Sequence, residues 1–438
     1  MISKDLLKII ILEQRKQFFD TKGFFKRKIL DAPEVQRAIC KTKEIIIISG
    51  VRRCGKSYLM RLIWQDIKKR LKTNDKQFFY FNFEHERLVN FKASDFSLLL
   101  ESYFELFEPN KREKTYLFLD ELQIIPFWQK FLNRLRESGN YKIIISGSNA
   151  TLLSKEISTQ LTGRNIPLEL QPLSFCEYLN IKMPDFRKID IYDLDKIIKI
   201  KKTLNQYIKS GGFPEVVKTK YYPLLQEYLR NIIYRDIVLR YKIKYEASLR
   251  EIVNFVMSNI GSILSLQQIA RMTNVKNINT VKNYLKYLEH SFLFYLVPRY
   301  SYSVKQQVYN PDKIYICDSG FYDQMGFKFS QNKGRILENF VFLELKRREK
   351  AIYYYKTQNN LEVDFVLTRN HKVRQLIQAC YQIDNLKTKQ REINSLVHAS
   401  QELKCSDLSV ITNDYEAEEK NKNKKIKFIP LWKWLLAN

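Results

Sequence analysis

The chain has 438 residues, more than one hydrophobic core usually contains, so the sequence predicts two or three domains. A hydrophobic content of 45% indicates a globular protein, and 75 Lys and Arg against 47 Asp and Glu give a formal net charge of +28. That charge favours an anionic partner such as nucleic acid, or else reflects a composition bias spread over the surface. The six cysteines show no C-x-x-C spacing and form no cluster with the four histidines, which indicates a reduced cytosolic protein without structural zinc.

Residues 1–44 are predicted to form helices that lead to the first strand, with Pro33 at a helix start. The apolar residues from Leu6 to Leu12 are interrupted by Lys8, and no small-residue cleavage site follows, so we expect no signal peptide. Because no apolar run in the chain is long enough to span a bilayer, we expect a cytoplasmic protein with no transmembrane helix and no membrane partner.

A short β-branched run, Ile45 to Ile48, ends at a glycine and is predicted to be a buried strand. The next eight residues, GVRRCGKS, fit the phosphate-loop pattern G-x-x-x-x-G-K-[ST], and apolar residues then recur at helical spacing. In such a loop backbone N–H groups and a helix N-terminus surround the phosphates, the lysine reaches the β- and γ-oxygens, and the serine ligates Mg²⁺. The predicted nucleotide-binding residues are Gly50, Arg52, Arg53, Cys54, Gly55, Lys56, Ser57 and Tyr58.

A second nucleotide signature follows an aromatic strand predicted over Phe78–Phe83. The strand predicted over Tyr116–Leu119 delivers Asp120 and Glu121 at its carboxyl end, where open α/β sheets bind their ligands. We predict that Asp120 holds Mg²⁺ together with Ser57. Glu121 is predicted to orient and polarise the attacking water, which favours hydrolysis over mere nucleotide binding.

A further strand, predicted over Tyr141–Ile145, ends in the polar sequence Ser-Gly-Ser-Asn. Either Ser148 or Asn149 would lie near the γ-phosphate and sense it, although a plain turn explains the same residues. Arg164 follows and either stabilises the transferred phosphoryl group, within one subunit or across two, or forms a surface salt bridge. The candidate catalytic residues are Lys56, Glu121, Ser148, Asn149 and Arg164.

Five segments together resemble a large group of little-characterised bacterial and archaeal ATPases: GVRRCGKS, LFLDE, SGSNATLLSKEI, TGRNIPLELQPLSFCEYL and GGFPEVV. These ATPases carry an AAA-type domain followed by a C-terminal domain of unknown function, and they are similar to the MNS clade of STAND-type NTPases. The resemblance implies an additional-strand, catalytic-glutamate ATPase that uses ATP and Mg²⁺, with Lys56, Ser57, Asp120 and Glu121 in the family roles. It implies no biological process.

A Lys/Ile-rich helical stretch and the Gly211-Gly212 turn are predicted to form the small lid of the AAA-type module, and an amphipathic helix follows over Tyr222–Tyr241. The next segment has the layout of a winged helix. Ser265 begins a capping-box pattern that opens a short helix, and from Val281 apolar residues recur at i, i+3, i+4 and i+7 in a second helix. The outward residues of this second helix would be Lys282, Asn283, Lys286 and Tyr287.

Strands over Phe292–Val297 and Lys313–Cys317, joined by a loop that contains Lys305, would form the wing. A recognition helix that presents Lys and Asn suits double-stranded DNA. A winged helix that docks an unknown protein partner suits the same pattern, so both interpretations stay open.

The C-terminal segment resembles the PD-(D/E)XK nuclease fold, in which a helix-borne Glu, an Asp and a Glu/Gln-x-Lys pair on adjacent strands gather a metal. A predicted helix is followed by strands over Ile352–Tyr355, Leu361–Leu367 and Leu376–Cys380. Matched residue by residue, the positions of this degenerate site are Glu338, Asp364, Gln378 and Cys380. Because a neutral thiol cannot replace an ammonium and Gln is a weaker ligand than a carboxylate, we expect a binding scaffold with little cleavage.

The Lys-rich segment Lys420–Lys427 is predicted to be a solvated loop, and Ile426–Ile429 and Trp432–Leu436 are predicted to close the fold as a strand and a short helix. The predicted domains are an N-terminal helical lead-in, a P-loop ATPase core, a helical lid, a winged helix and a nuclease-like domain, at residues 1–44, 45–175, 176–245, 246–320 and 321–438.

The sequence therefore predicts an α/β P-loop NTPase of the AAA type, with a helical lid, a winged helix and a C-terminal α/β nuclease-like domain. The predicted function is that of a Mg²⁺-dependent ATPase that acts as a nucleotide-driven switch. Two alternatives stay open: an ATP-gated DNA-processing nuclease, against which Cys380 argues, and a non-catalytic ATP-binding scaffold for protein partners, against which Lys56 and Glu121 argue. The sequence leaves open whether the chain forms a homo-oligomer.

Overall fold

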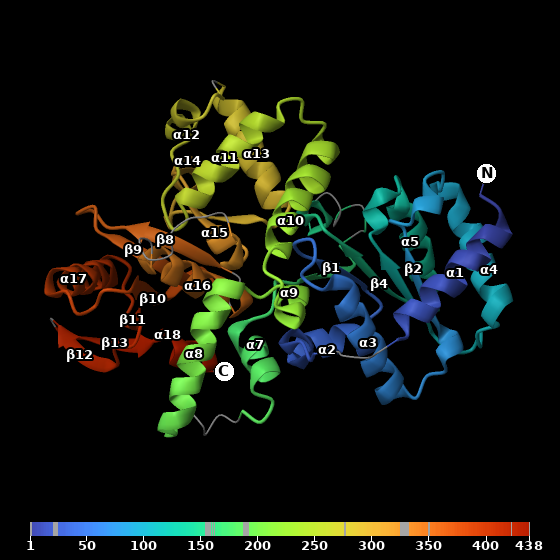
Figure 1. Cartoon of the computed structure of the whole chain (residues 1–438), viewed down its shortest axis with the longest axis horizontal. Coiled ribbons are helices and arrows are strands. Elements are labelled where there is room, and N and C mark those ends of the chain that lie inside the picture. The colour runs from blue at the N-terminus through green and yellow to red at the C-terminus, as the bar shows by residue number, and fades with distance from the viewer. Residues whose placement is uncertain are drawn as a thin grey trace. The chain divides into compact units, whose positions relative to one another are not determined.

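The computed structural model describes residues 2–20, 25–153, 159, 161, 163–186, 192–275, 277–324, 333–348, 351–421 and 423–437 (Figure 1). Parts of the predicted lid and of the segments SGSNATLLSKEI and TGRNIPLELQPLSFCEYL lie outside the described residues. The chain divides into two compact units, residues 1–171 with 290–292, and residues 172–289 with 293–438. Within the described ranges no helix is long and apolar enough to cross a membrane.

The first unit is built on a five-stranded parallel sheet in the order β2-β3-β4-β1-β5. Its strands are β1 (Ile45–Ser49), β2 (Phe78–Asn82), β3 (Thr115–Asp120), β4 (Tyr141–Gly147) and β5 (Asn165–Glu169). Strands β1 to β4 are almost continuously apolar and buried, as parallel strands covered on both faces require. Strand β4 lies between β1 and β3, so an additional strand separates the strand of the phosphate loop from the strand that carries Asp120.

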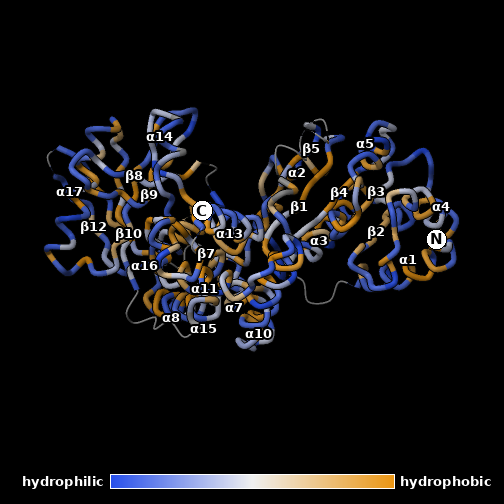
Figure 2. Tube along the Cα trace, turned by 90° about the horizontal axis from the view of Figure 1, so that it is seen from above, coloured by the Kyte–Doolittle hydropathy of each residue, from blue (hydrophilic) through white to orange (hydrophobic). Residues whose placement is uncertain are grey.

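Helices surround this sheet, and Figure 2 shows apolar stretches along the strands beside hydrophilic connections. The helices of the first unit are α1 (Lys4–Phe18), α2 (Pro33–Lys41), α3 (Lys56–Leu71), α4 (Phe96–Phe107) and α5 (Trp128–Ser138). Pro33 is the first residue of α2, as predicted. Because all five strands are parallel, their carboxyl ends meet at one edge of the sheet, where the phosphate loop and Asp120 both lie.

The second unit begins with helices and ends with a mixed sheet. Its helices before the sheet are α7 (Phe175–Lys182), α8 (Leu194–Ser210), α9 (Pro214–Thr219), α10 (Leu224–Asn231), α11 (Glu246–Ser258), α12 (Leu266–Met272), α13 (Ile278–His290), α14 (Val304–Tyr309), α15 (Gly320–Gln324) and α16 (Lys333–Arg348). The helix predicted over Tyr222–Tyr241 is present as α10 followed directly by a π-helical segment, Ile232–Leu239.

An antiparallel hairpin of β6 (Phe294–Val297) and β7 (Lys313–Ile316) follows α13. The prediction that Lys305 lies in a loop between these strands was wrong, because the connection contains α14. Ser303 caps this short helix by accepting a hydrogen bond from the backbone N–H of Gln306. A Ser followed by polar residues of good helix propensity is a helix-start signal that the sequence reasoning passed over.

The C-terminal sheet has six strands in the order β12-β13-β11-β10-β9-β8. They are β8 (Ile352–Lys356), β9 (Glu362–Arg369), β10 (Lys372–Cys380), β11 (Leu408–Thr412), β12 (Ala417–Asn421) and β13 (Lys424–Pro430). Strands β8, β9 and β10 form an antiparallel meander, and β10, β11 and β13 run parallel. Helix α17 (Leu386–Glu402) packs on β9 and β10, and α18 (Leu431–Leu436) closes the chain.

The prediction of a solvated loop over Lys420–Lys427 was wrong, because this segment belongs to the hairpin of β12 and β13. In β13 the lysines alternate with the buried residues Ile426 and Phe428, which is the period-two pattern of a half-buried strand. The high local charge masked that period. Lys425 also pairs with Glu418 on the edge strand β12, at 2.6 Å.

Candidate functional site

The phosphate loop joins β1 to α3 through two glycines with positive φ. At Gly50, where φ is +154°, an added Cβ would lie 2.0 Å from the carbonyl oxygen of Leu170, so a larger residue does not fit. Gly55, at φ +103°, caps α3 in a left-handed conformation that other residues rarely adopt. The loop thereby curls so that α3 begins at Lys56, with the helix N-terminus at the carboxyl edge of the sheet.

The ammonium of Lys56 lies inside the loop. Its Nζ donates hydrogen bonds to the carbonyl oxygens of Gly50, at 3.1 Å, and Val51, at 3.2 Å, and the side chain is buried. Both acceptors are neutral backbone groups. A positive charge that is held at the loop by neutral carbonyls is the arrangement that suits an anionic ligand.

Asp120 gathers three hydroxyl groups. Its Oδ2 accepts hydrogen bonds from Ser57 Oγ at 2.5 Å and from Tyr80 at 3.0 Å, and its Oδ1 accepts one from Ser146. Burial raises the pKa of Tyr80, and the Asp120 carboxylate raises it further, so the phenol stays a donor. The structure thus brings together Ser57 and Asp120, the two predicted metal ligands, and both offer the oxygen atoms that Mg²⁺ prefers.

Glu121 follows Asp120 in a left-handed backbone conformation, at φ +53°. Gln123 Nε2 donates a hydrogen bond of 2.5 Å to Glu121 Oε2 and so fixes the orientation of this carboxylate. Burial raises the pKa of Glu121; Lys56 and Arg52 act against that rise, whereas the neighbouring Asp120 adds to it. A carboxylate with a raised pKa is a better acceptor for the proton of an attacking water.

Gln123 in turn rests against Gly147, where an added Cβ would lie 2.3 Å from Gln123 Oε1. Sequence reasoning missed Gln123. Its only signal is its position two residues after the predicted catalytic acid.

The other predicted nucleotide-binding residues take different positions. Arg52 forms an ion pair with Glu84, at 3.1 Å between NH1 and Oε1, and Arg53 is exposed in a left-handed conformation. The thiol of Cys54 is fully buried, and burial raises its pKa, so this residue offers the loop its backbone and apolar packing. The hydroxyl of Tyr58 donates to the carbonyl oxygen of Phe25, at 3.2 Å.

The N-terminal lead-in contributes a buried arginine to the loop. Arg27 donates from NH1 to the carbonyl oxygen of Cys54, at 3.1 Å, and from NH2 to that of Gln171, at 2.7 Å. It therefore fastens the phosphate loop to the chain that leaves β5. No spacing rule links Arg27 with a loop that begins 23 residues later, which is why the sequence did not reveal it.

The remaining candidates fall at opposite edges of the sheet. Ser148 and Asn149 are buried directly after β4, at the same edge as Asp120. Arg164 is exposed, and its carbonyl oxygen accepts a hydrogen bond from the backbone N–H of Ile45, at the amino end of β1. Because β1 spans five residues, the backbone of Arg164 lies about 15 Å from the start of the phosphate loop. The structure does not bring it together with the other candidates.

The degenerate nuclease positions gather around a residue that sequence reasoning missed. Glu338 of α16 and Asp364 of β9 both accept hydrogen bonds from the ammonium of Lys313 in β7, at 2.7 and 2.8 Å. Gln378 accepts a hydrogen bond from the backbone N–H of Asp364, at 2.6 Å. Burial raises the pKa of Cys380 to about 12, so its thiol is neutral. Among the described residues, no group of three or more His, Cys, Asp or Glu is arranged to hold a metal ion.

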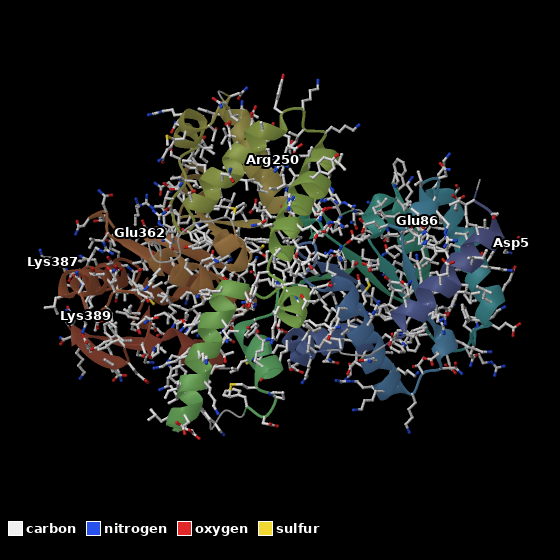
Figure 3. The ribbon with its side chains drawn as sticks, in the orientation of Figure 1. Asp5, Glu86, Arg250, Glu362, Lys387 and Lys389 are labelled. Carbon is white, nitrogen blue, oxygen red and sulfur yellow. The ribbon has the colours of Figure 1, made fainter. Side chains whose placement is uncertain are left out.

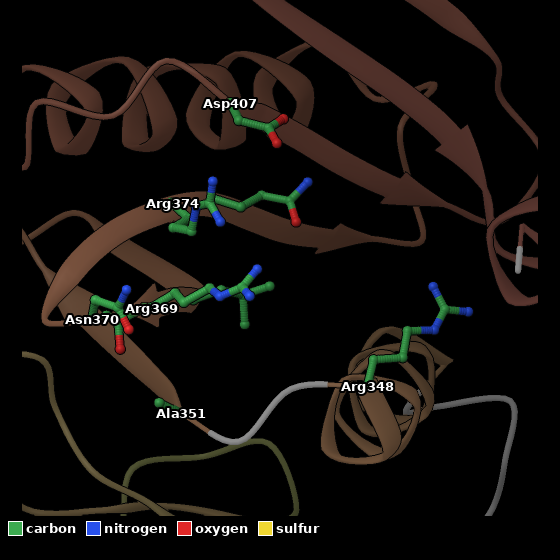
Figure 4. Close-up of a pocket in the computed structure, with 9 residues that line it drawn as sticks. Arg348, Ala351, Arg369, Asn370, Arg374 and Asp407 are labelled. Atoms are coloured by element: carbon green, nitrogen blue, oxygen red, sulfur yellow. The ribbon is translucent and has the colours of Figure 1, made fainter. Parts of the chain in front are cut away.

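A cavity of about 960 Å³ lies elsewhere on the C-terminal sheet and is shown in Figure 4. Arg348, Arg369 and Arg374 line it together with Asp407, and none of the predicted site residues does. Arg348 is already engaged, at 2.8 Å from Glu344 and 3.1 Å from the carbonyl oxygen of Trp434. The cavity is basic and lies at the end of the β9–β10 hairpin.

Comparison with known proteins agrees with this geometry. The family described as an AAA domain matches residues 42–179, and two families described as domains of unknown function match residues 201–332 and 333–434. A parallel central sheet with a phosphate loop at its carboxyl edge is the arrangement of P-loop NTPases, and residues 42–179 of the chain match the AAA domain family.

The chain belongs to the same family as an uncharacterized protein of Methanocaldococcus jannaschii, with which it is 36% identical over 95% of this chain and 96% of that protein. An uncharacterized protein of Haemophilus influenzae is 32% identical over 82% of this chain and 86% of its own length. A solved structure of the Aeropyrum pernix ORC1 protein in complex with DNA covers 74% of this chain and 98% of that one. The two chains are 14% identical, with a TM-score of 0.31.

We expect Arg27→Met to destabilise the first unit, because it leaves two buried carbonyl oxygens, those of Cys54 and Gln171, without their charged donor. The expected loss in the free energy of unfolding is about 3 kcal/mol, measured by urea denaturation. The matched control is Lys26→Met, which removes an exposed lysine paired with Asp31 and should cost less than about 1 kcal/mol. Equal losses in the two variants would show that Arg27 does not hold the loop.

Proposed function

We propose that this chain is a Mg²⁺-dependent ATPase that works as a nucleotide-driven switch. The single observation that carries the proposal is the hydrogen bond from Ser57 Oγ to Asp120. It joins the residue after the phosphate-loop lysine to the acid at the end of β3, and the next residue along the chain, Glu121, is oriented by Gln123. A phosphate loop, a metal-binding pair and a positioned carboxylate at one edge of a parallel sheet are the parts that ATP hydrolysis requires.

Each residue has a distinct role in this proposal. Lys56 would turn from the loop carbonyls to the β- and γ-phosphate oxygens, and the N-terminus of α3 would add its N–H groups. Ser57 and Asp120 would hold Mg²⁺, which neutralises charge on the phosphates when bound. Glu121 would orient the attacking water and accept its proton as the oxygen approaches the γ-phosphorus. Ser148 or Asn149, buried at the same edge, would sense the γ-phosphate.

Arg164 fits a role between subunits better than a role within one. Its exposure and its place at the amino end of β1 favour action on the nucleotide of a neighbouring copy over action on its own. We therefore propose that a homo-oligomer, where it forms, carries the switch from one subunit to the next.

We further propose that residues 246–320 form a winged helix that binds double-stranded DNA. Lys282, Asn283 and Lys286 are exposed together on α13, which supports a positive surface there. Tyr287, predicted to face outward with them, instead stacks on Tyr241 with ring centroids 3.7 Å apart. The stacked pair removes one aromatic side chain from the proposed surface and leaves its lysines.

Specific contacts argue against each of the two alternative functions. A nuclease needs its acidic residues for a metal, whereas Glu338 and Asp364 both bond to Lys313. A scaffold that only holds ATP has no need of a glutamate oriented beside the loop, yet Glu121 is so oriented by Gln123. The nuclease-like domain is therefore proposed as a binding module that the ATPase drives.

The test of the ATPase proposal is a pair of variants. Lys56→Ala should abolish ATP binding, because the loop loses the cation that faces the phosphates. Glu121→Gln should keep ATP binding and lose turnover by roughly 100-fold or more, because only the positioned base is removed. Binding is measured with a fluorescent ATP analogue and turnover by phosphate release. Wild-type turnover in Glu121→Gln would remove the catalytic assignment and favour the scaffold.

The DNA proposal is tested by replacing both Lys282 and Lys286 with Ala. Duplex binding should weaken similarly for all sequences, and the slope of log affinity against log salt should flatten by about 0.9 for each phosphate that the variant no longer neutralises. The matched control replaces Lys199 and Lys202, which are exposed on helix α8 and carry the same charge. If the two pairs lose affinity equally, net charge explains the binding, and a wild type that binds no duplex would favour docking of a protein partner.

A further inference from the structure

Three carboxylates of the second unit converge on one ammonium. Glu338 of α16, and Glu362 and Asp364 of β9, each place an oxygen 2.7 to 2.8 Å from Nζ of Lys313. The side chain of Lys313 is only 2% exposed. Glu362, labelled in Figure 3, is the most exposed of the three acids, at 34%. The ammonium donates hydrogen bonds to Glu338 and Asp364 and forms a third ion pair with Glu362.

The surroundings hold these acids in place. The hydroxyl of Tyr315, two residues after Lys313 in β7, donates to the same oxygen of Glu338, at 2.6 Å. The second oxygen of Asp364 accepts from the backbone N–H of Ala379, at 3.0 Å. Gly261 leaves room beside Glu338, since a Cβ at this position would lie 3.1 Å from the carboxylate. Glu338 and Asp364 are thus also held by groups other than the lysine.

The charges of the cluster do not balance. Three carboxyl groups face one ammonium, so the ionised cluster carries more negative than positive charge. The same carboxylates raise the pKa of Lys313 above its usual range, although burial alone would lower that pKa. A cluster of this kind has surplus negative charge that a second positive charge would neutralise.

Carboxylate oxygens are also ligands of divalent cations, although with Lys313 in place no group of three or more His, Cys, Asp or Glu among the described residues is arranged to hold one. Mg²⁺ and Mn²⁺ take carboxylate oxygens and water, and they supply two positive charges where the ammonium supplies one. One cation excludes the other, because Lys313 Nζ lies at the point on which the three oxygens converge. The position of the lysine therefore decides whether the site accepts metal.

We propose that Lys313 is a built-in cation that occupies a carboxylate site in place of a divalent metal and fastens β7 to α16 and β9. The lysine comes from the region matched by one domain of unknown function, residues 201–332, and the carboxylates come from the region matched by the other, residues 333–434. The ion pairs of the cluster thus connect two regions of the second unit. This proposal uses no residue of the phosphate loop. Its test is therefore independent of the ATPase proposal.

The test is the response of thermal unfolding to Mn²⁺ in the absence of nucleotide. Wild-type protein should melt at the same temperature with and without millimolar Mn²⁺. Lys313→Ala should melt at a lower temperature than wild type, because three carboxylates lose their counter-ion, and Mn²⁺ should raise that temperature by several degrees. The double variant Lys313→Ala/Asp364→Asn should lose most of this Mn²⁺ response.

One control variant and one alternative readout accompany this test. Lys305→Ala, which removes an exposed lysine from the same β6–β7 connection, should behave as wild type does. If Lys313→Ala does not fold alone, its refolding yield with and without Mn²⁺ replaces the melting temperature. The proposal is overturned if Mn²⁺ neither stabilises Lys313→Ala nor restores its folding, or if Mn²⁺ stabilises wild type as strongly as the variant.

Discussion

The buried carboxylate of Asp120 is the constraint on which the first unit depends. A carboxylate that is 1% exposed is costly unless donors surround it. Here the donors are the hydroxyls of Ser57, Tyr80 and Ser146, which come from α3, β2 and β4. The same hydrogen bonds that make Asp120 tolerable also fix the register of three sheet strands with the first turn of α3. The hydrogen bonds that stabilise the first unit around Asp120 therefore also place the proposed metal site.

Two of the three lysines that are buried among the described residues illustrate how the surroundings decide what a cation can do. Lys56 donates to backbone carbonyls, which are neutral and lose little when the ammonium turns toward a phosphate. Lys313 donates to Glu338 and Asp364, two largely buried acids that would lose their counter-ion without it. The first arrangement suits a ligand-binding group, and the second suits a permanent ion cluster. A buried lysine thus serves as a ligand-binding group in the first unit and as part of a permanent ion cluster in the second.

The sequence predicted the parts of the site that depend on local spacing. The phosphate loop and the Asp120–Glu121 pair follow strands that their own composition reveals, and the parallel sheet then brings both to one edge. Arg27, Gln123 and Lys313 were not predicted, because their partners are set by tertiary packing. No spacing rule connects an arginine or a lysine with distant carbonyls or acids.

Other predictions failed or changed for equally physical reasons. In β13 the high positive charge of the segment Lys420–Lys427 concealed the period-two pattern of a strand. The short helix α14 was hidden because six residues give too few turns for a helical period to show. For Arg164, chain position alone gave no indication of which edge of the sheet it would occupy. That depended on the pairing of β5 with β1.

The most direct measurement of the central claim is the Mg²⁺ dependence of ATP-analogue binding in Asp120→Asn. If Asp120 and Ser57 hold the metal beside a phosphate loop, wild type should bind the analogue at least about tenfold more tightly with Mg²⁺ than with EDTA. Asp120→Asn should keep the metal-free affinity, because Lys56 and the loop remain, and should lose the gain from Mg²⁺. An undiminished Mg²⁺ gain in Asp120→Asn would contradict the account.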